Sequence, residues 1–166
     1  MPHLSTYVGL ADRSEKTLAD SFRTVAEGHA HVADIFHTCH TLAQMSDTHR
    51  ELLAPVVERY GDDGAVDEPE RPHAPGLADA RRGEIGLLRD LQDLHTLADF
   101  LQTTWTVIAQ GAQGLRDRQL LEISRQAGSG TSRQLSWLDT RIKAAAPQAL
   151  VVTSAAHRVA ASRGDT

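Results

Sequence analysis

The chain has 166 residues, 40% hydrophobic and 23% charged, which is an ordinary composition for one folded domain with its own core. The net charge of −5 and the lack of a basic stripe argue against a nucleic-acid partner. The single cysteine excludes a disulfide within the chain and a zinc site made only of thiolates. We read no signal peptide and no apolar stretch of about 18 residues, so we expect a cytoplasmic protein without a membrane partner.

Apolar residues recur at intervals of three and four in four long segments, which predicts four helices. The first helix is expected at residues 5–28 and the second at residues 34–60. Asp34 is a suitable N-cap residue for the second helix. Pro55 lies inside that helix, where it should kink the helix or end its regular part early.

The third helix is expected at residues 84–114 and the fourth at residues 117–146. Gly128 and Gly130 interrupt the fourth helix, and each glycine costs about 1 kcal/mol of helix propensity relative to alanine. We expect these small residues to allow close approach of a neighbouring helix or to mark a local bend.

Residues 61–83, between the second and third helices, show no helical periodicity and form a loop of about 23 residues, which is long for a compact domain. Such a loop is long enough to run the length of the bundle. We therefore predict an all-α four-helix bundle over residues 5–152, built from two helical hairpins joined by a long crossover loop. Residues 153–166 are expected to form a flexible C-terminal tail.

In the ferritin-like fold, two helical hairpins are joined by one long crossover connection. Residues 5–146 resemble this fold in their connectivity. The chain as a whole resembles ferritin-like bundle proteins of GC-rich bacteria. In di-iron members of this family, two helices each supply a glutamate and the other two each supply a Glu-x-x-His motif, all facing inward. The resemblance therefore implies a search for inward-facing glutamate and histidine residues at one level of the bundle.

Glu15 and His49 are expected at the same level when the first two helices pair as an antiparallel hairpin. The rest of the di-iron pattern is missing, because Ser46 stands three residues before His49, and Thr131 and Gln134 occupy the places of Glu-x-x-His. We expect His49 to be a core histidine that is hydrogen-bonded to Glu15, Thr131 or Gln134. The alternative is an altered metal site with Glu15 and His49 as the ligands of an iron or another metal ion.

Histidine is concentrated between residues 29 and 49. His37 and His40 lie on the polar face of the second helix, close to His31 in the preceding turn. We interpret them as solvated surface residues, with a surface Zn²⁺ or Ni²⁺ site as the alternative because imidazole suits both ions. His29 lies on the apolar side of the first helix and is expected to close one end of the core.

Asp90 lies among leucines of the third helix, at the level of Arg141 on the fourth. This placement predicts a structural ion pair between the two side chains.

We find neither a strained nucleophile turn nor a phosphate-binding glycine loop, which favours a protein without catalytic activity. Small residues that we expect to be exposed would suit pairing with a second copy or with a protein partner. These residues are Gly83, Gly86, Ala109, Ala112, Gly128 and Gly130. The sequence therefore predicts an association or structural module, in a homodimeric form, with a metal-binding or redox protein around Glu15 and His49 as the alternative.

Overall fold

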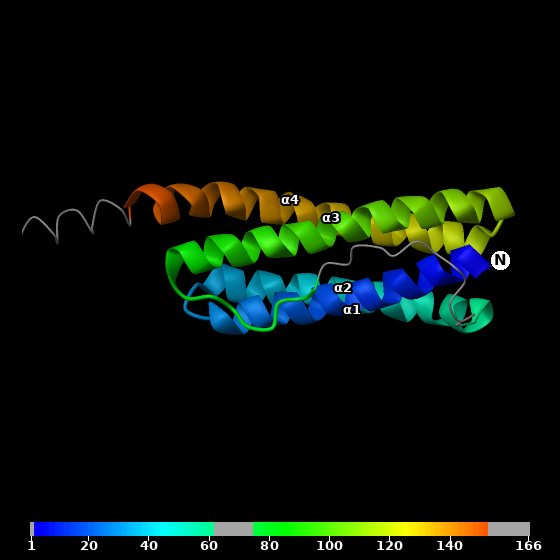
Figure 1. Ribbon diagram of the computed structural model, residues 1–166, viewed down its shortest axis with the longest axis horizontal. Helices are drawn as coiled ribbons and strands as arrows, with labels where there is room; N and C mark the ends of the chain where they lie inside the picture. Colours follow the sequence, from blue (N-terminus) through cyan, green and yellow to red (C-terminus); the bar gives the residue numbers. More distant parts are fainter. Residues whose placement is uncertain (1, 62–74, 153–166) are drawn as a thin grey trace, which may run out of the picture.

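The computed structural model describes residues 2–61 and 75–152, which form an all-α four-helix bundle (Figure 1). Its helices are α1 (Pro2–Gly28), α2 (Ala33–Tyr60), α3 (Gly83–Leu115) and α4 (Arg118–Pro147), and a short turn, η1 (Gln148–Val152), continues α4. The four predicted helices are confirmed, and each end lies within three residues of its expected position. None of the described helices is long and apolar enough to span a membrane. The predicted tail at 153–166 lies outside the described residues.

The helices form two antiparallel hairpins, α1 with α2 and α3 with α4, and the hairpins meet through α1 against α3 and α2 against α4 (Figure 1). His29 at the end of α1 contacts Asp90 near the beginning of α3. Tyr60 at the end of α2 contacts Asp117 at the beginning of α4. The segment between α2 and α3 therefore joins opposite ends of the bundle, which confirms the predicted crossover connectivity. Residues 62–74 of that segment lie outside the described part of the chain.

The described end of the crossover, residues 75–82, follows the second half of α1. The backbone N–H of Leu77 donates a hydrogen bond of 3.1 Å to Ser21 Oγ. Further along, a Cβ atom at Gly28 would stand only 2.1 Å from the Cβ atom of Ala80. A glycine at the end of α1 therefore lets the crossover pass close to the helix.

Two details expected of α2 differ in the structure. Of the two alternatives for Pro55, a kink or an early end of the regular helix, the early end is wrong, because the helix continues to Tyr60 as its predicted bounds required. Pro55 is exposed, and water can therefore hydrogen-bond the carbonyl that lacks an N–H partner. Val32 occupies the N-cap position in place of Asp34, which lies in the first turn, where its negative charge favours the positive end of the helix dipole.

Asp117 fastens the beginning of α4 to the end of α2. Its Oδ1 atom accepts a 3.0 Å hydrogen bond from the Leu120 backbone N–H, as an N-cap residue does. Its Oδ2 atom accepts hydrogen bonds from the Tyr60 hydroxyl, at 2.8 Å, and from the Arg59 guanidinium. Burial acts to raise the pKa of Asp117, but these hydrogen bonds and the Arg59 charge outweigh it and hold the pKa below its ordinary value.

We expect Asp117→Ala to lower the free energy of unfolding by about 1 kcal/mol or more at pH 7, because the helix loses its N-cap. The pKa of Asp117 is lowered on folding, so its stabilisation is present above the ordinary aspartate pKa and disappears as the pH falls through the lowered value. The difference between Asp117→Ala and the wild type, measured by urea unfolding, should therefore shrink under strongly acidic conditions. Asp139→Ala, which removes an exposed ion pair with Lys143, is the control and should change stability by less than about 0.5 kcal/mol. Equal effects of the two substitutions would contradict the assignment.

Candidate functional site

The most completely buried acidic group in the middle of the bundle is Glu15 of α1, and it connects three helices. Its Oε1 atom accepts a 2.8 Å hydrogen bond from His49 Nδ1 of α2 and a 3.0 Å hydrogen bond from Trp105 Nε1 of α3. All three residues are at most 5% exposed. The other carboxylate oxygen, Oε2, is buried without a hydrogen-bond partner among the described residues. The predicted contact between Glu15 and His49 is therefore present, and Trp105 is a third member that sequence reasoning did not place there.

The fourth helix completes this layer through a glycine. A Cβ atom at Gly130 of α4 would stand 2.3 Å from His49 Nε2 and 2.5 Å from its Cε1 atom. Real Cβ atoms do not approach other atoms so closely, so the imidazole occupies the space that any larger residue would need. The close helix approach predicted from Gly130 is confirmed, and α4 runs through this region without interruption.

The other predicted core polar residues satisfy one another nearby. Gln134 Nε2 donates two 3.0 Å hydrogen bonds, one to the Leu42 carbonyl and one to Ser46 Oγ. Thr131 Oγ1 donates to the Ala127 carbonyl at 3.0 Å. Ser46, Thr131 and Gln134 are all fully buried. Of the three partners considered for His49, the structure shows a hydrogen bond to Glu15.

The ligand set around Glu15 and His49 does not fit a di-iron centre. Such a centre needs several carboxylates, whereas this layer provides one carboxylate and one imidazole, bonded to each other. Nowhere in residues 2–61 and 75–152 do three histidine, cysteine, aspartate or glutamate side chains gather as a metal site would require. Glu15 Oε2 is a buried oxygen atom without a hydrogen-bond partner in this layer, and a cation could bind there.

The surface histidines are not brought together. His40 Nε2 lies 3.0 Å from Glu27 Oε1, which ties α2 to α1. His37 packs against the edge of the Phe36 ring, and His31 is exposed in the turn between α1 and α2. On this surface too, the described residues contain no group of three histidine, cysteine, aspartate or glutamate side chains that could hold a metal ion.

The predicted ion pair between Asp90 and Arg141 is wrong. Asp90 accepts hydrogen bonds from His29 Nε2 at 2.9 Å and from both the backbone N–H and the guanidinium of Arg81, at 2.9 and 2.7 Å. Arg141 instead lies 3.1 Å from Asp34 of α2. Asp90 lies on the flank of α3 that faces α1 and the crossover, whereas Arg141 lies on the flank of α4 that faces α2. His29 is 2% exposed and closes this end of the core as predicted.

Cys39 and three of the small residues expected at an association surface are buried, so they cannot contact a partner. Cys39 is fully buried, and burial is the main cause that raises the pKa of its thiol to about 12. Gly86, Ala112 and Gly130, which we expected on the surface, are also buried.

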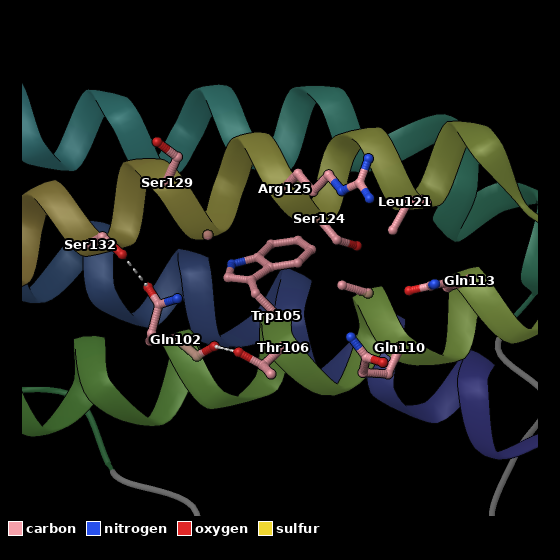
Figure 2. Close-up of a pocket in the computed structure, with 12 residues that line it drawn as sticks. Gln102, Trp105, Thr106, Gln110, Gln113, Leu121, Ser124, Arg125, Ser129 and Ser132 are labelled. Atoms are coloured by element: carbon pink, nitrogen blue, oxygen red, sulfur yellow. Dashed lines mark hydrogen bonds between the residues drawn. The ribbon is translucent and has the colours of Figure 1, made fainter.

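A groove of about 370 Å³ lies between α3 and α4, and Trp105 lies at its base (Figure 2). Its lining consists of polar and small side chains and includes no acidic residue. The lining residues are Gln102, Trp105, Thr106, Ala109, Gln110, Gln113, Leu121, Ser124, Arg125, Gly128, Ser129 and Ser132. Sequence reasoning missed this groove, although residues 100–115 carry no charged side chain, which was a readable signal.

The chain was compared with models of known protein families, with curated proteins and with solved structures, and none of them matches it. The likeness to ferritin-like proteins therefore rests on the helix connectivity.

We expect Gly130→Ala to lower the free energy of unfolding by about 1–3 kcal/mol, because the new methyl group must displace the His49 ring. Gly128→Ala is a matched control two residues away on the same helix, where a Cβ atom would make only ordinary contacts of 3.7 and 3.8 Å. That variant should be as stable as the wild type or up to about 1 kcal/mol more stable. Urea unfolding followed by circular dichroism measures both. A Gly130→Ala protein with wild-type stability would show that His49 does not occupy this position.

Proposed function

We propose that this protein is a non-catalytic helical association module that pairs with a second copy of itself. The observation that supports this function is the outer face of α3 within residues 100–115. This stretch contains no charged side chain, although 23% of the whole chain is charged. Val107 in its middle is 45% exposed, and Leu115 at its end is 39% exposed. Depletion of charge around exposed apolar residues is typical of the core of a protein interface.

The large exposed apolar side chains of the described residues all belong to α3 and η1. They are Ile85, Val107, Leu115, Leu150, Val151 and Val152. The hairpin of α1 and α2 carries ion pairs on its surface, for example Arg50 with Asp12 and Lys16 with Asp20. The α3 side is therefore the face on which burial in a complex would remove apolar surface from water.

A second copy is the partner that the charges favour. Each chain has a net charge of −5, so two copies repel each other over most orientations. The repulsion is least where both chains present an uncharged helix face. The exposed amide of Gln110 can both donate and accept hydrogen bonds. The hydroxyl groups of Thr103 and Thr106 donate to carbonyls of their own helix, and their oxygen atoms can still accept. The same face is therefore complementary to itself. Symmetric dimers, in which identical surfaces meet, are the commonest assembly of soluble proteins.

The proposal predicts that Val107→Glu converts a dimer into a monomer. The substitution places a carboxylate at the centre of both contacting faces, and a desolvated charge without a partner weakens binding strongly. Sedimentation velocity over a range of concentrations measures the change, and we expect the dimer dissociation constant to rise at least about 100-fold.

Thr48→Glu is the matched control, because it also replaces a β-branched, exposed residue within a helix but lies on α2. This variant should sediment as the wild type does. A wild-type protein that remains monomeric at all concentrations, or equal effects of both substitutions, would overturn the proposal.

A metal-binding or redox protein with Glu15 and His49 as ligands is the second candidate function, and one observation favours it. Glu15 Oε2 is buried without a partner, and a cation there would balance the carboxylate. Elemental analysis of untagged protein, purified from cells grown with added iron, zinc or nickel, tests this candidate. If the first proposal holds, we expect less than about one metal ion per ten chains, and Glu15→Gln should leave that value unchanged. A stoichiometric metal that Glu15→Gln removes would establish the second candidate instead.

A further inference from the structure

The groove between α3 and α4 is large enough to hold a small molecule. Its volume of about 370 Å³ falls within the range of roughly 300–1,000 Å³ that is typical of ligand sites. Described helices form its lining on both sides. The groove borders the proposed dimer contact, because Thr106 and Gln110 belong to both. Val107, on which the dimer contact depends, is not among the lining residues.

The charge of the lining residues favours a negatively charged ligand. Arg125 is the one charged residue in the lining, and it is exposed. Within the described part of the chain, its guanidinium makes no hydrogen bond or ion pair with another side chain. A guanidinium has a planar fork of donors that matches a carboxylate with two parallel hydrogen bonds. An anionic group therefore has a partner in this groove, and a cationic group has none.

Amides at both ends of the groove supply further hydrogen bonds. Figure 2 shows Gln102 beside Ser132 at one end of the groove, with Gln110 and Gln113 toward the other end. Gln102 Oε1 accepts a 3.2 Å hydrogen bond from Ser132 Oγ, which orients the amide so that its nitrogen can donate. Polar atoms on the body of a ligand would therefore find both donors and acceptors.

The base of the groove is closed and apolar. Trp105 lies there with only 1% of its surface exposed, and its Nε1–H is already bonded to Glu15. Gly128 on the opposite helix has no side chain, and a Cβ atom at that position would stand 3.8 Å from the Cβ atom of Trp105. The missing side chain lowers the wall of the groove at this point, beside the buried indole.

We propose that this groove binds a small organic carboxylate. The carboxylate pairs with Arg125, and the body of the ligand lies along the groove beside Gly128, where its polar atoms meet the glutamine amides. The proposed ligand site and the proposed dimer contact share Thr106 and Gln110, but they depend on different residues, Arg125 and Val107.

Nicotinate and its neutral analogue nicotinamide are suitable probes, because they share one planar ring and differ in the carboxylate. The full-length protein, labelled with ¹⁵N, has two tryptophan indole signals, and Trp137→Phe assigns them. Titration with nicotinate should shift the Trp105 indole signal saturably and leave the Trp137 signal in place. Nicotinamide should bind at least about tenfold more weakly, since it lacks the charge-assisted contact.

Arg125→Gln removes the charge from an exposed position and should lower nicotinate affinity about tenfold, to the level of nicotinamide. Arg133→Gln, another exposed arginine of α4 that does not line the groove, is the matched control and should bind nicotinate as the wild type does. Val107→Glu keeps every lining residue and should also bind nicotinate, so that loss of the dimer can be distinguished from loss of the ligand site. The proposal is overturned if nicotinate causes no saturable shift of Trp105, if nicotinamide binds equally well, or if Arg125→Gln has no effect.

Discussion

The arrangement of the four helices depends on one buried carboxylate. Taking the side chain of Glu15 out of water costs several kcal/mol unless the protein replaces the lost hydrogen bonds. His49 and Trp105 provide that replacement from two other helices, at 2.8 and 3.0 Å from the same oxygen atom. A shift of either helix by one residue would break these bonds and leave a buried charge without compensation. The pair therefore sets the register between α1, α2 and α3, and Gly130 sets how closely α4 approaches.

Two more aspartates act in the same way at the ends of the bundle. Asp90 joins α3 to His29 and to Arg81, while Asp117 joins α4 to Tyr60 and to the end of α2. Each accepts hydrogen bonds from residues far away in the sequence, so each favours one connectivity of the helices over the alternatives. Apolar packing supplies most of the stability of such a bundle, whereas directional polar contacts select one arrangement.

Polar groups in the core stabilise the fold, whereas the groups available for binding lie on the surface. The histidine, glutamate and glutamine side chains of the core are largely occupied with one another, and Glu15 Oε2 and Gln134 Oε1 are the buried oxygens that they leave without partners. The side chains that remain available to bind another molecule lie on α3 and on the neighbouring face of α4. Val107 is exposed within residues 100–115, which carry no charged side chain, and Arg125 lines the groove. This division is the reason for proposing a protein that acts by binding.

The sequence by itself determined the four helices and their connectivity, because apolar spacing reports local structure and a long loop between hairpins leaves few alternatives. It also placed Glu15 opposite His49, since the level of two residues in a tight hairpin follows from counting. Only the tertiary structure decided the direction in which each side chain points around its helix. That is why Asp90 meets His29 in place of Arg141, and why Trp105 joins Glu15. Contacts between hairpins depend on the rotation of whole helices, which is set by the packing of all side chains together.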